Sequence, residues 1–291
     1  MEQKFGNCKI IKFEPCNQIS EQLENFAAEF FEVVEINYTD EGEEQLIGYM
    51  RTDADVLELS EVASNYGVIL PKYSIEVLPG RDWLKENVIK FAPVEVEDFY
   101  VYGIHEKNVD TRGKIGIKVY AATAFGSEHQ TTKCCLRGIS DINRLGCAPQ
   151  RILDVGTGSG ILSLAAAKLW SQARIVAVDI DTESVAVTEQ NAADNGVKTQ
   201  IKALYSDGYT AKGVKENAPY DVILANILAR PLIAMAADMA AHLKIGGYAV
   251  ISGFIDEQVD WVVGEHEKYG LALQKIYADE QWRAALLKRI K

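Results

Sequence analysis

The chain has 291 residues, of which 48% are hydrophobic, and this is enough for two ordinary domains with separate cores. Its formal net charge is −12, which argues against a broad nucleic-acid surface, because such a surface needs clustered Lys and Arg. An acidic surface would instead attract a basic partner, although surface charge more commonly just keeps a protein in solution.

The sequence shows no segment of transmembrane length, and its N-terminus lacks the basic start and apolar run of an export signal. We therefore expect a cytoplasmic protein. The five cysteines are odd in number and form no CxxC pair, so we expect small core residues rather than a zinc site.

Residues 1–80 predict a small separate unit with the order strand, helix, strand, strand, helix, strand, which is typical of the ferredoxin-like α+β arrangement. The expected strands cover residues 9–13, 33–38, 46–50 and 75–78, and the expected helices cover residues 19–30 and 56–66. No catalytic constellation appears there, so we expect this unit to hold a partner. After a break at Pro79 and Gly80, residues 81–93 predict an interdomain linker.

The second expected domain, residues 94–291, begins with β-rich sequence. Residues 99–104 and 115–120 predict the two strands of a hairpin. A stretch of polar and small residues then leads into a helix at residues 132–145, for which Thr131 or Thr132 is a natural N-cap.

A glycine turn is the central feature of this domain. Residues 151–155 predict a short buried strand and residues 161–170 a helix, and between them stand Gly156, Gly158 and Gly160. Such a turn lets a ligand approach the main chain closely, and the helix N-terminus offers unpaired amides. A glycine run alone also occurs in ordinary tight turns, but the flanking strand and helix favour a nucleotide-like ligand.

The residues around the turn distinguish between two ligands. Ile161 stands where the dinucleotide fingerprint needs a third glycine. Asp154 would repel a pyrophosphate but attract a cationic amino acid group. Asp179, at the end of the next strand, is 23 residues beyond Gly156 and well placed to accept hydrogen bonds from ribose hydroxyls. These features favour S-adenosylmethionine over NAD.

The rest of the domain alternates strands and helices, which predicts a parallel sheet with right-handed crossovers. The expected strands cover residues 174–178, 201–205, 220–225 and 248–252, and the expected helices cover residues 182–195, 231–243 and 257–268. Residues 271–278 and 282–290 predict a terminal hairpin that adds an antiparallel edge.

Two further polar residues fall at the carboxyl ends of expected strands, where ligands of parallel sheets bind. Asp207 is placed to accept a hydrogen bond from an adenine amino group, but Ser-Asp-Gly is equally an ordinary turn. Asn226 follows a fully apolar strand, and an amide there needs partners that a cofactor or an acceptor amine would supply.

At these residues the sequence resembles the bacterial methyltransferases of ribosomal protein L11, the PrmA family, over nearly the whole chain. The resemblance rests on the Ala-Phe-Gly to His-x-Thr-Thr stretch at 124–132, the glycine turn at 154–162, Asp179-Ile-Asp181, Asn191-Ala with Asn195-Gly-Val, Asn226-Ile-Leu-Ala, and Ser252-Gly. It implies a seven-stranded Rossmann-like class I methyltransferase sheet, preceded by a ferredoxin-like substrate-recognition domain.

The resemblance also implies roles for single residues. Thr132 would contact S-adenosylmethionine, and Gly156 would be the first glycine of the turn. Asp179 would bind the ribose, and Asn226 would lie beside the methyl-transfer centre as the catalytic residue. With the residues argued above, the expected cofactor site consists of Thr132, Asp154, Gly156, Gly158, Asp179, Asp207 and Asn226. The sequence departs from the family's usual AFGTGxHxTT pattern, because its loop is one residue shorter.

The implied activity is methyl transfer to lysine side chains, to the N-terminal amine or to both in ribosomal protein L11, a basic substrate. No metal, direct nucleic-acid recognition or membrane contact is expected, and a monomer is the default. The alternatives are a lysine methyltransferase of the same build with another protein substrate, an RNA methyltransferase, a dinucleotide-dependent oxidoreductase and a binding module without catalysis. The acidic balance disfavours the RNA enzyme. Ile161 and Asp154 disfavour the oxidoreductase, and the shortened loop leaves the binding module open.

Overall fold

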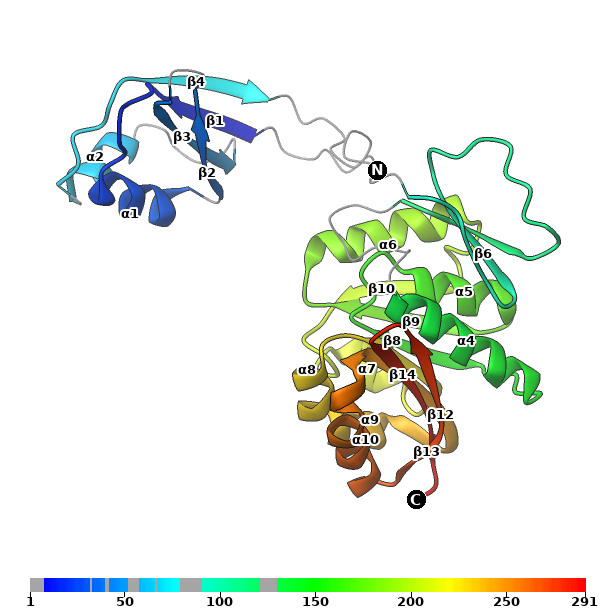
Figure 1. The fold of residues 1–291 in the computed structure, drawn as a ribbon. Helices are drawn as coiled ribbons and strands as arrows, with labels where there is room; N and C mark the ends of the chain where they lie inside the picture. Colours follow the sequence, from blue (N-terminus) through cyan, green and yellow to red (C-terminus); the bar gives the residue numbers. More distant parts are fainter. Residues whose placement is uncertain are drawn as a thin grey trace. The chain divides into compact units, whose positions relative to one another are not determined.

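The computed structural model describes residues 8–31, 33–39, 42–51, 58–65, 67–78, 91–120 and 130–291. Residues 1–86 and 87–291 form two compact units (Figure 1). Each unit has its own buried hydrophobic residues. Within the described ranges, no helix is long and apolar enough to cross a lipid bilayer.

In its described residues, the first unit is an antiparallel sheet with the strand order β2-β3-β1-β4 and two helices. Its elements follow the chain order that the sequence predicts: β1 (Cys8–Phe13), α1 (Glu21–Phe30), β2 (Val33–Tyr38), β3 (Glu44–Arg51), α2 (Glu58–Asn65) and β4 (Tyr73–Leu78). Ser20 begins helix α1, because its hydroxyl accepts a hydrogen bond from Leu23 N at 3.3 Å. The core between helices and sheet includes Phe13, Phe26 and Leu59.

The second unit is built on a mixed sheet of seven described strands in the order β10-β9-β8-β11-β12-β14-β13. The strands that pair in parallel are β8 (Arg151–Val155), β9 (Arg174–Asp179), β10 (Ile201–Tyr205), β11 (Tyr220–Asn226) and β12 (Leu243–Ile255). Strands β13 (Leu271–Asp279) and β14 (Trp282–Arg289) form the predicted terminal hairpin. The antiparallel strand of this hairpin is β14, which lies between β12 and β13 rather than at the edge of the sheet.

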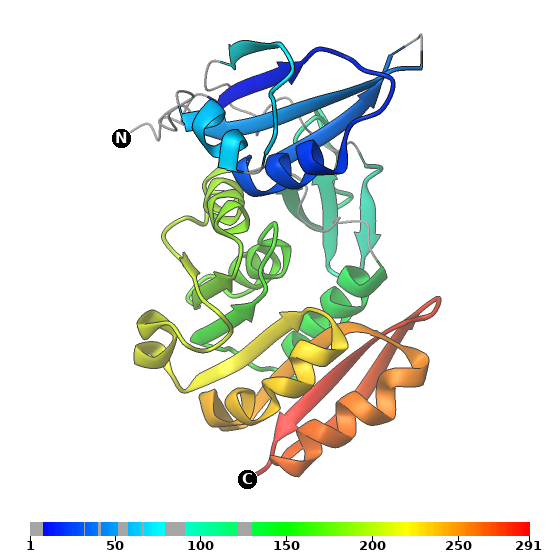
Figure 2. The ribbon, with the colours of Figure 1, turned by 90° about the vertical axis from the view of Figure 1, so that its left-hand side faces the viewer.

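Helices cover both faces of this sheet. Successive side chains of a strand point to opposite faces, so the neighbouring residues Ile152 and Leu153 of β8 lie in different hydrophobic clusters. On the face of Ile152 lie α4 (Gln130–Arg144), α5 (Ile161–Leu169) and α6 (Thr182–Asp194). On the face of Leu153 lie α7 (Lys212–Asn217), α8 (Ala229–Ala234), α9 (Ala236–His242) and α10 (Val259–Lys268). Figure 2 shows α10, in orange, alongside the red terminal hairpin.

Two helical predictions need correction. Helix α7 was not predicted, because it is six residues long and buries only Val214, which gives no helical periodicity. The helix predicted at residues 231–243 is two helices, since Met235 has φ −99° and ψ 8°, outside the helical range, and separates α8 from α9. Strand β12 already begins at Leu243, so it is longer than the predicted strand at residues 248–252.

A three-stranded sheet precedes helix α4. Its strands are β5 (Val94–Val96), β6 (Phe99–Gly103) and β7 (Ile115–Val119). The hairpin predicted for β6 and β7 is wrong, because these strands pair in parallel, with Phe99 beside Ile115. Residues 104–114 return the chain to the start of β6, and the antiparallel partner of β6 is instead β5. Phe91, at the end of the predicted linker, packs into the hydrophobic core of the second unit.

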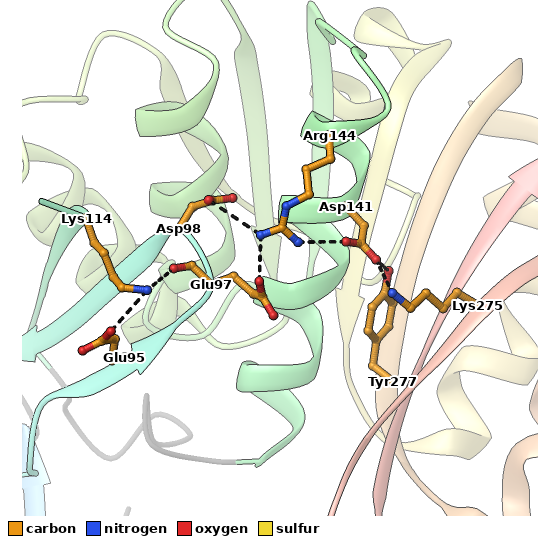
Figure 3. A network of polar contacts seen from close by, with 8 residues as sticks. All are labelled: Glu95, Glu97, Asp98, Lys114, Asp141, Arg144, Lys275 and Tyr277. Atoms are coloured by element: carbon orange, nitrogen blue, oxygen red, sulfur yellow. Dashed lines mark hydrogen bonds and ion pairs between the residues drawn. The ribbon is translucent and has the colours of Figure 1, made fainter.

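Ionic contacts attach the small sheet and the terminal hairpin to helix α4 (Figure 3). Arg144, in the last turn of α4, contacts Glu97 of the β5–β6 turn at 2.7 Å and Asp141 at 3.0 Å. Asp141 accepts hydrogen bonds from Lys275 at 2.6 Å and from Tyr277 at 2.7 Å, both on β13. These contacts fix the position of helix α4, whose first turn carries Thr132 of the predicted site.

Candidate functional site

The predicted glycine turn lies between β8 and α5. Gly156, Gly158 and Gly160 have φ of 69°, 54° and 80°, which is the left-handed region that favours glycine. Gly156 N donates to Val178 O of the neighbouring strand β9 at 2.8 Å. A Cβ on Gly156 would overlap the side chain of Ile227, which follows β11. The turn is therefore fixed against the ends of both strands that flank β8.

The structure brings Asp179, at the end of β9, to this turn. Gly158 N donates to Asp179 Oδ2 at 2.9 Å, and Asp181 N donates to Oδ1 at 3.0 Å. The carboxylate is half-buried, and its oxygens have lone pairs left for further donors. Apart from Gly158 and its two chain neighbours, no atom of the described chain stands within 4 Å of a Cβ built on Gly158, so the described residues leave the turn open beside its contact with Asp179.

Asp154 is buried beneath the turn. Its Oδ2 accepts hydrogen bonds from Thr157 Oγ1 at 2.9 Å and from Ser163 Oγ at 2.7 Å, and so ties the turn to helix α5. Its Oδ1 is also buried and has no hydrogen-bond partner among the described residues. Burial raises the pKa of Asp154 to about 6. Sequence reasoning missed Thr157 and Ser163, and the only available signal was their hydroxyl groups three and nine positions after Asp154.

The structure also brings together Asn226 and Thr132, which are 94 residues apart in the chain. Asn226, the last residue of β11, donates from Nδ2 to Thr132 Oγ1 at 3.4 Å. Thr131 and Thr132 lie inside the first turn of α4, so the prediction that one of them caps the helix is wrong, because the helix already begins at Gln130. Residues 121–129, which contain the rest of the predicted threonine stretch with its histidine, lie outside the described residues.

Asp207 is exposed in the turn that follows β10. Ser206 Oγ donates to Gly208 O at 2.8 Å and accepts from Ala211 N at 3.1 Å, so an ordinary hydrogen-bonded turn accounts for the Ser-Asp-Gly sequence. Ser206 N donates to Asp179 O at 2.9 Å. Asp207 therefore lies at the same edge of the sheet as Asp179, and the structure shows no more specific role for it.

Helix α6 supplies contacts that sequence reasoning did not find. Asn191 is fully buried, and its Nδ2 donates to Ser159 O within the glycine turn at 2.8 Å. Asn195, one helical turn later, accepts from Lys118 N of β7 at 3.0 Å. Both asparagines belong to the motifs that carry the family resemblance. They are four positions apart and therefore lie on one helix face, and this spacing was the signal that both contact the same neighbouring segment.

In the described part of the chain, no three or more His, Cys, Asp or Glu side chains are grouped so that they could hold a metal ion. Cys16, Cys134, Cys135 and Cys147 are free thiols. Burial raises the pKa of Cys134 to about 11, so this thiol is a poor nucleophile at neutral pH.

Fold and site together define a class of enzyme. The parallel strands run in the order β10-β9-β8-β11-β12, the antiparallel strand β14 is inserted beside β12, and a glycine turn follows β8. Asp179 closes β9 and contacts that turn. This is the arrangement of the class I methyltransferases.

Comparison with known proteins identifies the family. The model of the family ribosomal protein L11 methyltransferase (PrmA) matches residues 8–290. The ribosomal protein L11 methyltransferase of Rhodopseudomonas palustris is 35% identical over 215 residues, which are 74% of this chain and 72% of that protein. The one of Brucella suis is 34% identical over 269 residues, which are 89% of this chain and 94% of that protein.

A solved structure is also similar. The crystal structure of ribosomal protein L11 methylase from Lactobacillus delbrueckii subsp. bulgaricus has a TM-score of 0.61 and 26% identity, and the match covers 70% of this chain and 100% of that chain. The predicted family is confirmed, and this chain belongs to the PrmA family. It is a methyltransferase with S-adenosylmethionine as its cofactor.

Proposed function

We propose that this enzyme transfers methyl groups to amino groups of ribosomal protein L11, at lysine side chains, at the N-terminal amine or at both. The observation that carries the proposal is the family match over residues 8–290, because it includes the first unit as well as the methyltransferase sheet. A class I sheet by itself serves enzymes with many substrates. The relative from Brucella suis, in contrast, matches across both units and is named for L11.

The first unit is the substrate-recognition domain in this proposal. Residues 1–80 contain 16 Asp and Glu but only five Lys and Arg, so they carry 11 of the 12 net negative charges of the chain. Concentrated negative charge attracts a positively charged partner, so it supports a basic substrate such as a ribosomal protein. We interpret the strand order β2-β3-β1-β4 as a ferredoxin-like domain, joined by a linker at residues 81–93 to a methyltransferase domain at residues 94–291.

The proposed cofactor site surrounds the glycine turn. S-adenosylmethionine supplies there a methyl group bonded to a sulfonium. Asp179 would accept hydrogen bonds from ribose hydroxyls beside the open side of Gly158. Asp154 Oδ1, buried and without a partner among the described residues, would accept one from the ammonium group. The complete proposed site is Thr132, Asp154, Gly156, Gly158, Asp179, Asp207 and Asn226.

The acceptor amine must be neutral to react. A free lysine has a pKa near 10.4, so presenting its neutral form at pH 7 costs roughly 4 to 5 kcal/mol. Burial of the amine beside a sulfonium lowers this pKa, because desolvation and the neighbouring positive charge both disfavour the ammonium. The enzyme therefore needs a group that orients the amine more than it needs a strong base.

Asn226 is the residue that we propose for this task. Its Nδ2 donates to Thr132 Oγ1, which fixes the side-chain amide, and no described residue donates to its Oδ1. Oδ1 would accept one N–H of the amine and direct the lone pair towards the methyl group, without holding the proton as a carboxylate would. Alignment of the reacting atoms would supply much of the rate acceleration.

The proposal includes a cytoplasmic location and a monomer that does not recognise nucleic acid or membranes. Free cysteines among the described residues fit a reducing compartment. Residues 81–291 hold 25 Lys and Arg against 26 Asp and Glu, so they have no net positive charge with which to attract phosphates.

Intact-mass analysis tests the proposed substrate. Purified L11 is incubated with the enzyme and S-adenosylmethionine, and we expect its mass to rise in steps of one methyl group. Asp179→Ala should give no increase, because it removes the proposed ribose ligand. Cofactor binding without any mass gain in L11 would contradict the proposal and favour another protein substrate or a catalytically impaired loop.

A further inference from the structure

One face of helix α6 carries three polar side chains that reach two other segments of the second unit. Thr188, Asn191 and the C-cap residue Asn195 stand at positions i, i+3 and i+7, which places them on the same side of the helix. One of the two segments is the glycine turn. The other is strand β7 with Tyr120, the residue that follows it.

Asn191 contacts both segments. Its Oδ1 accepts a hydrogen bond from Tyr120 N at 2.8 Å. Its Nδ2 donates to Tyr120 O at 3.0 Å and to Ser159 O at 2.8 Å. The side chain is fully buried, so water does not replace any of these bonds when they are lost. A single amide therefore joins the glycine turn to the end of β7.

The two neighbours of Asn191 on this face each contact only one segment. Thr188 Oγ1 donates to Gly158 O in the glycine turn at 3.0 Å. Asn195 binds only β7, where it accepts from Lys118 N at 3.0 Å and donates to Lys118 O at 2.6 Å, besides a bond within its own helix. Of these three residues, Asn191 alone connects the two segments.

The middle of the glycine turn depends on these contacts. The start of the turn is held by Val178 O and by Asp154. Beyond it, Gly158 N donates to Asp179, and apart from its chain neighbours no described residue comes within 4 Å of a Cβ built on Gly158. The carbonyls of Gly158 and Ser159 are both held by α6, and a buried carbonyl without a donor is costly, so losing α6 contacts would let the turn relax.

We propose that Asn191 is a positioning residue for cofactor binding and methyl transfer. It holds the Ser159 carbonyl and the Tyr120 backbone in one fixed arrangement, and this keeps Gly158 and Asp179 in the geometry that the cofactor binds. Asn191 acts through these backbone groups. The inference rests on the proposed cofactor site at the glycine turn.

A matched pair of variants tests this role. Asn191→Asp and Asn195→Asp each keep the acceptor oxygen for β7 or Tyr120 and each lose two amide hydrogen bonds, but only Asn191 donates to the glycine turn. In calorimetric titration with S-adenosylhomocysteine, well below the unfolding midpoints, we expect Kd to rise about tenfold for Asn191→Asp and less than about threefold for Asn195→Asp. Thr188→Val, which removes one turn contact, should raise Kd about threefold.

Amide hydrogen exchange provides a readout that does not need the cofactor. Asn191→Asp should lose protection both in residues 116–120 and in residues 156–163, whereas Asn195→Asp should lose it only in residues 116–120. Equal increases of Kd in the two Asp variants, or wild-type affinity in folded Asn191→Asp, would overturn the proposal. If the Asp variants do not fold, Asn191→Ser and Asn195→Ser allow the same comparison.

Asp179→Ala separates this inference from the proposed cofactor site. Wild-type affinity for S-adenosylhomocysteine in Asp179→Ala would mean that the proposed site is wrong. Lost affinity in Asp179→Ala, combined with wild-type affinity in the Asn191 variants, would leave the site in place and remove the positioning role of Asn191.

Discussion

The first unit concentrates negative charge, whereas the second unit balances its charges and uses them in specific contacts. Residues 1–86 hold 18 acidic against seven basic side chains, and residues 87–291 hold 24 against 23. In the second unit Arg144 pairs with Glu97 and Asp141 (Figure 3), and Asp154 is buried to hold a turn. We infer that charge acts at long range in the first unit, to attract a basic protein, and at short range in the second, to fix a reactive site.

The largest expected effect is on the rate of methyl transfer, with little change in the recognition of L11. Asn226→Ala removes the proposed orienting oxygen, and we expect kcat to fall about 100-fold because the acceptor amine is no longer aligned. KM for L11 should stay within about twofold, since the first unit is unchanged. Steady-state kinetics with purified L11 measure both constants. Wild-type kcat in this variant would exclude the role of Asn226.

A buried carboxyl group in the second unit should make the stability of the protein depend on pH. The folded-state pKa of Asp154, about 6, lies above its unfolded value near 3.9, so the folded protein holds this proton more tightly. The associated stability is complete below about pH 4 and is lost as pH rises to about 6, and it amounts to about 3 kcal/mol.

Asp154→Asn measures this contribution. The amide keeps an acceptor for Thr157 and Ser163 but does not ionise, so the variant should unfold at a higher temperature than wild type at about pH 7.5. The difference should shrink as pH falls to about 4.5, where the wild-type carboxyl is protonated in the folded state. Thermal unfolding of both proteins at the two pH values checks this. A difference that does not change with pH contradicts it.

A smaller effect is expected from one surface charge of the first unit. Glu24 is exposed on helix α1. Glu24→Lys should raise KM for L11 about threefold at low ionic strength and leave kcat unchanged, because it weakens the attraction of a basic partner. The increase should shrink in about 0.5 M salt, where the charges are screened.

Glu257→Lys is the matched control for this charge reversal. Glu257 is exposed in the second unit, so its reversal should leave KM for L11 unchanged if the first unit alone attracts the substrate. Equal increases of KM in the two variants would show that total charge, and not its concentration in the first unit, governs the encounter with L11.

The smallest effect concerns the ionic contacts of helix α4. Arg144→Ala should lower the free energy of unfolding by only about 0.5 to 1 kcal/mol, because the guanidinium is half-exposed and its ion pairs are screened by water. Urea unfolding measures this loss, and kcat/KM for L11 should stay within about twofold. A loss above about 3 kcal/mol would mean that these contacts behave as a buried network.

Much of the second unit was predictable because its signals are local. The apolar run that ends at Asp179 became strand β9, and the two terminal segments became a hairpin. The alternate glycines gave a turn with three left-handed residues. Strand period and glycine conformation depend on neighbouring residues only, so the sequence carries them directly.

Other features depended on pairing between distant segments. The direction of β7 relative to β6 was predicted wrongly, because a connection of 11 residues at 104–114 allows either a hairpin or a parallel return. Helix α7 was too short to give a periodic pattern. The contacts of Asn191 with Tyr120 span 71 residues, and no local pattern indicates them.

The sequence by itself determined the family, the order of the main elements and the strand ends where Asp179 and Asn226 stand. Only the tertiary structure decided which polar groups meet: Asn226 with Thr132, Asp154 with Ser163, and Asn191 with both the glycine turn and Tyr120. The physical reason is the range of each interaction. Backbone conformation and hydrophobic period are set within a few residues, whereas a buried hydrogen bond forms only after packing has brought its two groups together and removed water.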